Sequence, residues 1–257
     1  MNDLPSVREL RSITQPDNVV NRPNAEHWMG RLYLRALSPY VTRIAIRSGL
    51  SANSVTALMI LTGLIGVWSF ALSGPLAYIG VAGVQIYLLL DCVDGEVARF
   101  RRTQSAKGIY LDRWGHYVVE TSLFIALGIR AFNGDEVKYV IIGLLAALFA
   151  ALTKVETDLV DSARLNSDLG IMPHSATAME NKTLATGRNI IRFFPFHRLA
   201  HAAEASLAVA VAITIDLVRN DLAASRVTVV VLAAILAVVM PLHLISVLLS
   251  TRLTSQS

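Results

Sequence analysis

The sequence predicts an all-α integral membrane protein with six transmembrane helices, and three observations support this fold class. The chain of 257 residues is 54% hydrophobic and only 16% charged, whereas a soluble domain is about 25% charged. Its mean hydropathy is +0.52. Long apolar segments alternate with basic ones, as expected of a chain whose main solvent is lipid.

Six segments hold the run of about 20 mostly apolar residues that a helix needs to cross the hydrocarbon core. They are residues 52–73, 75–98, 109–132, 137–160, 201–219 and 225–250. The last segment is the most uniformly apolar. The second and third carry acidic residues near the point where they meet, so the sequence places charge close to membrane depth.

An amphipathic helix is expected before the first span, over residues 28–49. Apolar and arginine positions interleave there at helical spacing, which is typical of a juxtamembrane helix on a lipid surface. A helix packed on the protein's own surface would show the same pattern. Residues 1–27 form a polar segment that we expect to be loosely ordered, and it lacks the apolar region of a cleavable signal peptide. Residues 251–257 form a short tail after the membrane domain of residues 28–250.

The basic residues of the loops predict the orientation. One side of the predicted bundle carries most of them: Arg43, Arg47, Arg101, Arg102, Lys107, Arg164, Lys182, Arg188, Arg192, Arg198 and Arg252. The other side holds Arg219 and Arg226 in a short turn. By the positive-inside rule both termini are expected on the cytoplasmic side, and we expect the cell membrane as the location.

Acidic residues gather between the second and third spans. Asp91 and Asp94 are three residues apart, and Asp112 and His116 are four apart, so each pair shares a helix face. If the two helices form an antiparallel hairpin, three carboxylates and an imidazole converge in a polar cavity at the cytoplasmic side. Charged groups at this depth are functional candidates by default.

Three carboxylates in one cavity would repel each other unless a cation binds between them. Oxygen ligands favour Mg²⁺ or Mn²⁺, and two such ions would suit displacement at phosphorus. Small residues, Gly95 and Ala98, leave room for a ligand beside the backbone, and Arg99 offers a fork that suits a pyrophosphate. The alternative is that these acids are helix-end charges that pair with nearby arginines.

The same residues resemble the signature of the CDP-alcohol phosphotransferase family, D-x2-D-G-x2-A-R-x8-G-x3-D-x3-D. Seven of its eight fixed positions are present with every gap preserved, namely Asp91, Asp94, Gly95, Ala98, Arg99, Gly108 and Asp112. A second hallmark of the family, Asn-x-x-Thr at the start of the first span, resembles Asn53-Ser54-Val55-Thr56. The likeness extends over about residues 28–250.

The resemblance implies a metal-dependent transferase that moves a substituted phosphate group from a CDP-linked donor, such as CDP-diacylglycerol, to a hydroxyl acceptor and releases CMP, in phospholipid or cell-envelope lipid biosynthesis. It implies that Asp91, Asp94 and Asp112 bind metal. By the same likeness, the nucleotide contacts are residues 53–56, Gly95, Ala98, Arg99, Ser105 and Gly108. It also implies a homodimer in membrane lipid, and we expect no nucleic-acid partner.

The last aspartate of the signature is replaced by His116. In the family this position is a metal ligand and the general base. An imidazole accepts a proton near neutral pH but is a poorer Mg²⁺ ligand than a carboxylate. Glu120, one turn further on, either orients the imidazole or pairs with another group in the helix bundle. The alternative is a catalytically weakened membrane protein that still binds nucleotide.

The predicted fourth loop, residues 161–200, is basic. An anionic acceptor such as a sugar or polyol phosphate would suit it, and so would the headgroups of anionic lipids, which is the interpretation we favour. Near the end of the fourth span, Lys154, Glu156, Asp158 and Asp161 either line an acceptor pocket or solvate a helix end.

Overall fold

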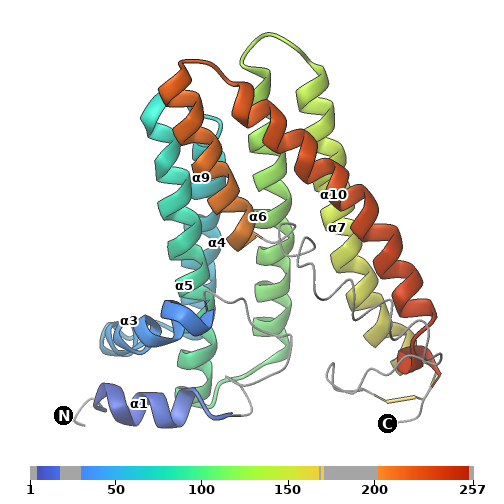
Figure 1. Ribbon diagram of the computed structural model, residues 1–257. Coiled ribbons are helices and arrows are strands. Elements are labelled where there is room, and N and C mark those ends of the chain that lie inside the picture. Colours follow the sequence, from blue (N-terminus) through green and yellow to red (C-terminus); the bar gives the residue numbers. More distant parts are fainter. Residues whose placement is uncertain (1–4, 18–29, 168, 171–201, 255–257) are drawn as a thin grey trace. The chain divides into compact units, whose positions relative to one another are not determined.

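The computed structural model describes residues 5–17, 30–167, 169–170 and 202–254, and the regular elements within these ranges are helices (Figure 1). The chain divides into two compact units. Unit 1 contains Met1–Leu72 and Leu76–Val119, and unit 2 contains Ser73–Pro75 and Glu120–Ser257. The predicted all-helical architecture is therefore confirmed for the described part of the chain.

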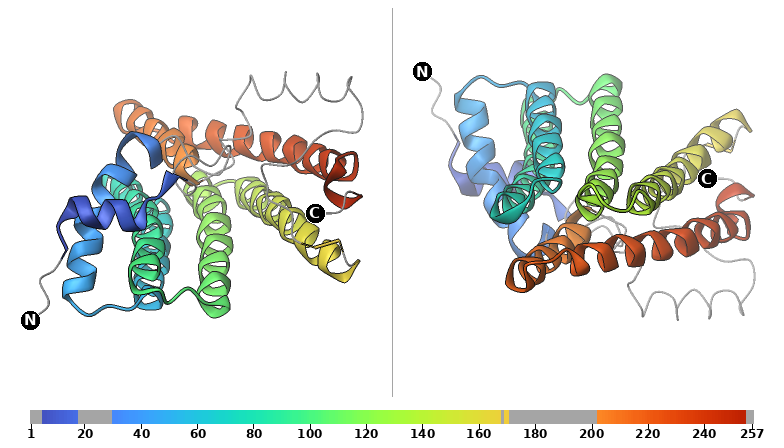
Figure 2. Two further views of the ribbon diagram at one scale, coloured as in Figure 1. Left: turned by 90° about the horizontal axis from the view of Figure 1, so that it is seen from below. Right: turned by 90° about the horizontal axis from the view of Figure 1, so that it is seen from above.

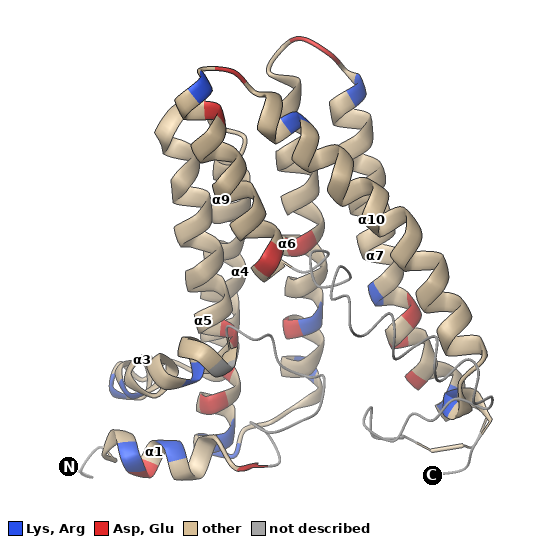
Figure 3. Ribbon diagram, in the orientation of Figure 1, with Lys and Arg blue, Asp and Glu red and all other residues tan. Residues whose placement is uncertain are grey.

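Unit 1 is built around two long helices that lie side by side. Its elements are α1 (Val7–Thr14), a π-helical turn (Gly30–Leu34), α3 (Arg35–Arg47), α4 (Ala52–Ser69), α5 (Tyr78–Arg101) and the first half of α6 (Ala106–Phe132). The 3₁₀ turn before α5 (Gly74–Ala77) has residues in both units. A short turn joins α4 to α5, so the two run antiparallel. Helices α1 and α3 pack against α5 and against each other, across the end of α5 that holds its acidic residues (Figures 1 and 3).

Helices α4 and α5 approach each other closely because glycines face each other across the contact. A Cβ atom added at Gly83 would lie 2.5 Å from the Cα atom of Gly66. One added at Gly80 would lie 2.5 Å from a ring carbon of Phe70. Small residues at such crossings are typical of helix packing in membranes, where van der Waals contact rather than the hydrophobic effect holds the helices together.

Unit 2 contains the second half of α6, α7 (Lys138–Asn166), α9 (Ala202–Arg219), α10 (Ala223–Leu248) and a 3₁₀ turn (Thr251–Leu253). Helix α10 packs along α7 and also contacts α9 (Figure 2). The crossing of α6 and α7 repeats the glycine contact of unit 1. A Cβ atom at Gly128 would lie 2.8 Å from the carbonyl oxygen of Tyr139 and 3.0 Å from the Cα atom of Gly143.

A buried ionic network joins α6, α9 and α10. Arg130 donates from Nε to Ser225 Oγ at 2.8 Å, and its Nη2 lies 3.6 Å from Asp216 Oδ2. The other carboxylate oxygen of Asp216 accepts the backbone N–H groups of Ala224 and Ser225 at 2.9 and 3.3 Å. Asp216 therefore neutralises a buried cation and satisfies the first turn of α10.

We expect the Asp216→Asn variant to lose about 3–5 kcal/mol of stability, because the change leaves the Arg130 guanidinium buried without its counter-charge. Thermal unfolding of the detergent-solubilised protein would measure the loss. The matched control is Asp221→Asn, at an exposed carboxylate that pairs with the exposed Arg219. Its unfolding midpoint should stay near that of the unaltered protein, and equal midpoints for the two variants would contradict the assigned role of Asp216.

Within the described residues, four helical stretches are long and apolar enough to cross a membrane. They are α4, the stretch Gly74–Arg101, α7 and α10. The predicted spans 109–132 and 201–219 correspond to α6 and α9, which are helical but are not among these four stretches, and they carry ionisable groups such as Arg130 and Asp216 within their apolar sequence. Six spans therefore remain a prediction.

The helices end at other residues than the predicted spans. The helix of the first span, α4, ends at Ser69, and those of the second and fourth, α5 and α7, continue to Arg101 and Asn166. The predicted amphipathic helix 28–49 is a π-helical turn followed by α3, with residues 28–29 outside the described ranges. Most of the basic loop, including Lys182, Arg188, Arg192 and Arg198, also lies outside them.

The expectation of a loosely ordered N-terminal segment was wrong for residues 7–14, which form α1. Ser6 and Glu9 form a capping box: the Glu9 N–H donates to Ser6 Oγ at 3.2 Å, and the Ser6 N–H donates to Glu9 Oε2 at 2.7 Å. This backbone hydrogen bond is the main reason that the pKa of Glu9 lies below its ordinary value. Leu10 and Thr14 are fully buried, so one face of α1 belongs to the interior of unit 1.

Candidate active site

The site lies between α5 and the first half of α6, where the chain reverses direction. Helix α5 ends at Arg101, and its C-cap residue Arg102 adopts a left-handed conformation with φ of 54°. Ser105 directly precedes α6, and its hydroxyl accepts the backbone N–H of Gly108 at 3.1 Å. This turn sets the acidic face of α5 opposite the first three turns of α6.

Three of the predicted ligands come together in the hairpin. Ligand atoms of Asp91, Asp112 and His116 all lie within 4.8 Å of one another, and the three side chains are half-buried. His116 Nε2 lies 3.0 Å from Asp91 Oδ1 and 3.5 Å from Asp112 Oδ1. The two carboxylates and the imidazole therefore converge on one small volume.

This donor set fits a divalent cation. Neighbouring ligand atoms of an octahedral Mg²⁺ site lie about 3 Å apart, since each is about 2.1 Å from the ion. The separations from His116 Nε2 to the two carboxylates are close to this value. Two hard oxygen ligands and one nitrogen suit Mg²⁺ and Mn²⁺, with the nitrogen favouring Mn²⁺.

Asp94, the third carboxylate that we predicted as a metal ligand, has a partner on α4. It is buried on α5, and its Oδ2 accepts a hydrogen bond of 2.7 Å from Thr56 Oγ1 on α4. It is not in the group whose ligand atoms lie within 4.8 Å, among the residues that the structure describes. Thr56 thus ties the acidic face of α5 to the first turn of α4.

Tyr87 is a site residue that the sequence analysis missed. It is fully buried on α5, one turn before Asp91, and its Oη lies within hydrogen-bonding distance of His116 Nδ1. The two rings meet edge to face, with centroids 5.6 Å apart. The imidazole is thus held on one nitrogen by Tyr87 and on the other by Asp91, which fixes the plane of the ring.

We expect Tyr87→Phe to weaken Mn²⁺ binding about 10- to 100-fold, the usual effect of losing a hydrogen bond that orients a ligating histidine. Isothermal titration of the purified protein with Mn²⁺ would measure this. Tyr110→Phe is the control. Tyr110 lies on the same half of α6 as His116, and 72% of its surface is exposed. Equal Mn²⁺ affinities for Tyr87→Phe and the unaltered protein would show that the hydroxyl does not support the site.

The structure separates the predicted Asn53–Thr56 turn into groups with different surroundings. Asn53 faces α6, because a Cβ atom at Gly108 would lie 3.2 Å from its Oδ1. Ser54 is exposed and belongs to the cap of α4, where its N–H donates to Ser51 Oγ at 3.1 Å. Val55 is buried in a core cluster with Ala45, Val93 and Val97. Asn53 and Thr56 are therefore the members of the turn that lie toward the hairpin.

Gly95, Ala98 and Arg99 lie together on the last turns of α5. A Cβ atom at Gly95 would lie 3.1 Å from Arg99 Nη1 and 3.3 Å from Nη2, so the guanidinium group lies against the glycine. Arg99 Nε donates to the backbone carbonyl of Thr14 at 2.6 Å. Ser105, the other predicted nucleotide contact, is exposed and has the capping role described above.

Glu120, which we expected to orient the imidazole, has another partner in unit 2. Its carboxylate is buried, and its Oε2 lies 3.1 Å from Lys154 Nζ on α7. Further along α7, Glu156 Oε2 lies 2.8 Å from His243 Nδ1 on α10. The predicted contact between Glu120 and His116 stays a prediction, whereas Lys154 and Glu156 link helices within unit 2.

Comparison with solved structures identifies a known fold. The chain is similar to the crystal structure of phosphatidylinositol phosphate synthase (PgsA1) from Mycobacterium tuberculosis with CDP-DAG bound, with a TM-score of 0.55 and 16% sequence identity. The match covers 86% of this chain and 98% of that one. No family model and no curated protein sequence matches the chain.

The fold and the four long apolar helices define an integral membrane protein of helical architecture. The likeness to the synthase concerns the fold, because sequence identity is low. The chemistry must therefore be argued from the residues of the hairpin.

Proposed function

We propose that this chain transfers a substituted phosphate from a CDP-linked donor, such as CDP-diacylglycerol, to a hydroxyl acceptor and releases CMP. The observation that carries the proposal is the convergence of Asp91, Asp112 and His116 beside the buried Asp94. The preserved spacing of the family signature supports it, as does a fold shared with a synthase that was solved with CDP-DAG bound.

The metal site of this proposal consists of Asp91, Asp112 and His116, and Asp94 is proposed as a ligand of a second ion. When bound, Mg²⁺ or Mn²⁺ would neutralise the pyrophosphate of the donor and the charge that develops on phosphorus. Asn53, Thr56, Gly95 and Arg99 are proposed to bind the nucleotide. The absence of a side chain at Gly95 leaves room for the guanidinium of Arg99, which offers two parallel N–H groups to the phosphates.

In the proposed reaction the acceptor oxygen forms a bond to the phosphorus next to the donor's alcohol group. The bond from this phosphorus to the bridging oxygen of CMP breaks, and CMP leaves with the electron pair. The proton of the acceptor hydroxyl passes to a base, for which we propose His116, half-buried between Tyr87 and Asp91. His116 Nε2 is also placed to ligate the metal, and experiment separates the two roles.

We further propose six spans, with both termini and the site at the cytoplasmic side of the cell membrane, and a role in lipid biosynthesis. The distribution of arginine and lysine supports the orientation. The acidic residues of α5 lie at the end where α1 and α3 pack, as Figure 3 shows. A homodimer is proposed on the family resemblance alone.

The deciding experiment is an assay of CMP release by the purified protein in Mg²⁺ or Mn²⁺, with several CDP-alcohols and a broad panel of acceptors. Release that requires both a donor and an acceptor would support the proposal. Binding of CDP without release over the whole panel would favour the catalytically weakened nucleotide-binding protein. A protein that neither binds CDP nor releases CMP would overturn the proposed function.

A further inference from the structure

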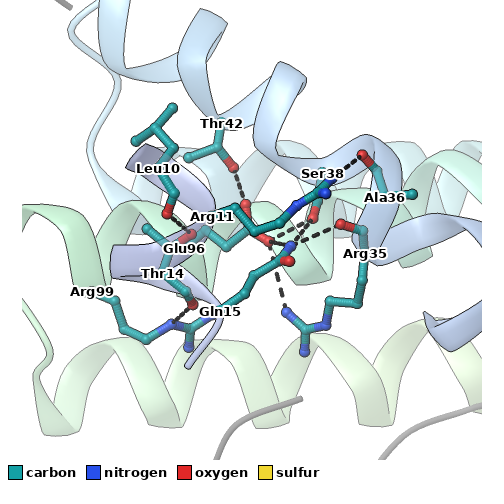
Figure 4. Close-up of polar contacts among 10 residues, drawn as sticks. All are labelled: Leu10, Arg11, Thr14, Gln15, Arg35, Ala36, Ser38, Thr42, Glu96 and Arg99. Carbon is teal, nitrogen blue, oxygen red and sulfur yellow. Dashed lines mark hydrogen bonds and ion pairs between the residues drawn. The ribbon is translucent and has the colours of Figure 1, made fainter. Parts of the chain in front are cut away.

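Helix α1 contacts the candidate nucleotide site, although it lies outside the region of family resemblance. Figure 4 shows α1 crossing α3 and α5, with Thr14 and Gln15 at its end close to Glu96 and Arg99. The side chains of Leu10 and Thr14 are fully buried in this contact region. The end of α1 is thus placed by interior packing rather than resting loosely on the surface.

Glu96 is the centre of the polar contacts that hold α1 and α3 on α5. Its side chain is completely buried. In the sequence it stands between two predicted site residues, Asp94 and Arg99. Oε1 accepts from Gln15 Nε2 at 2.8 Å and lies 3.8 Å from Arg35 Nη1. Two hydroxyl groups of α3, those of Ser38 and Thr42, donate to Oε1 and Oε2. A buried carboxylate is stable only with such donors, so loss of any of these contacts would cost free energy.

Gln15 fixes the end of α1. Its Nε2 lies 2.8 Å from Glu96 Oε1, 2.8 Å from the carbonyl oxygen of Arg35 and 3.2 Å from Ser38 Oγ. The two hydrogens of the amide are shared among these three acceptors, two of which lie on α3 and one on α5. The contacts hold Gln15 against both helices. Because Thr14 directly precedes Gln15, the position of the Thr14 carbonyl is fixed at the same time.

That carbonyl accepts the Nε–H of Arg99 at 2.6 Å. The C-terminus of a helix carries partial negative charge and favours a cation there. The contact uses the Nε side of the guanidinium, and the two terminal nitrogens, Nη1 and Nη2, remain against Gly95. The direction of the fork is therefore set by α1 and not by α5 alone.

We propose that the end of α1, fixed by Gln15 on Glu96, orients Arg99 for the pyrophosphate of the donor. Thr14, Gln15 and Glu96 are positioning residues, since they act through Arg99. This inference rests on the proposed function and adds an N-terminal element to its donor site. A guanidinium already held in place loses less conformational freedom when the anion binds, so the contact increases affinity for the donor.

The test is a titration of the full-length protein with CDP and with CMP, in Mg²⁺, for Gln15→Ala, Arg99→Lys and the double variant. We expect Gln15→Ala to weaken CDP binding about three- to tenfold, the usual range for losing hydrogen bonds that position a charged group. CMP lacks the second phosphate, so its affinity should change less than about twofold. In the Arg99→Lys background, where the Nε contact is already gone, Gln15→Ala should have no further effect.

The control is Ser12→Ala, because Ser12 is exposed on α1 and donates only within the helix, to the carbonyl oxygen of Glu9. Its CDP affinity should equal that of the unaltered protein. Unchanged CDP binding in Gln15→Ala would overturn the inference. So would equal losses for CDP and CMP, or a loss that persists in the Arg99→Lys background, because either would indicate general loosening of unit 1.

The outcomes also separate this inference from the proposed function. If the unaltered protein binds CDP but never releases CMP, the transfer reaction fails while the CDP titrations still decide the role of α1. If the unaltered protein does not bind CDP, both proposals are overturned.

Discussion

The Asp112→Asn variant is expected to lose CMP release by about a thousandfold or more, because a catalytic metal ion contributes several kcal/mol to the transition state. Asp112 lies in the hairpin with its Oδ1 3.5 Å from His116 Nε2. Replacing the carboxylate by an amide preserves the shape of the side chain and removes its charge. The expected loss is therefore one of metal binding rather than of packing.

Removal of the metal should have the same effect in the unaltered protein. EDTA should abolish CMP release, and added Mg²⁺ or Mn²⁺ should restore it. Asp91→Asn should behave like Asp112→Asn, since both carboxylates face His116 Nε2. Asp135→Asn is the matched control, at an exposed carboxylate that pairs with Arg226 in unit 2. Full activity in Asp112→Asn, or activity that survives EDTA, would show that the hairpin is not a metal site.

Helical periodicity was enough to predict which acidic residues share a face. Asp91 lies three residues before Asp94, and Asp112 lies four residues before His116, so a tight turn between two helices brings the faces together. The spacing did not show how the face of α5 is divided. Thr56 holds Asp94 against α4, and only the packing of α4 on α5 reveals that contact.

Tyr87 and α1 could not be predicted for physical reasons. Tyr87 lies in an apolar run, and its hydroxyl is distinguished only by the imidazole that it meets on another helix. Helix α1 has eight residues, and so short a helix is unstable in isolation. Its order depends on burial of Leu10 and on Gln15 meeting Glu96, which are separated by 81 positions. The polar composition of residues 1–27 gave no sign of these contacts.

The ionisable residues of α6 and α9 illustrate a different limit. Arg130 and Asp216 lower the hydropathy of their helices, so composition alone assigns these helices less clearly to the membrane. In the structure they satisfy each other in the interior of unit 2, with Ser225 as a third partner. Charged residues within apolar segments therefore serve two purposes here. In unit 1 they form a candidate metal site, and in unit 2 they form a structural network.

His116→Ala is expected to lose about 10²- to 10⁴-fold in the rate of CMP release, the usual contribution of a general base. His116 meets the Tyr87 hydroxyl with one ring nitrogen and Asp91 with the other, so it is held in one orientation beside the predicted metal. Glu120→Gln should cost less, because the Glu120 carboxylate pairs with Lys154 in the structure. His116→Asp, which restores the family signature, should keep appreciable activity.

The metal dependence of His116→Ala separates the two roles proposed for the imidazole. If His116 is the base, the loss of rate should persist at saturating Mn²⁺, and the Mn²⁺ affinity should stay close to that of the unaltered protein. If His116 is a ligand, Mn²⁺ affinity should fall and saturating Mn²⁺ should restore most of the rate. Turnover near that of the unaltered protein at ordinary Mn²⁺ would exclude both roles. The acceptor hydroxyl would then have to lose its proton to another group. Asp91 would be the first candidate, since its Oδ1 lies 3.0 Å from His116 Nε2.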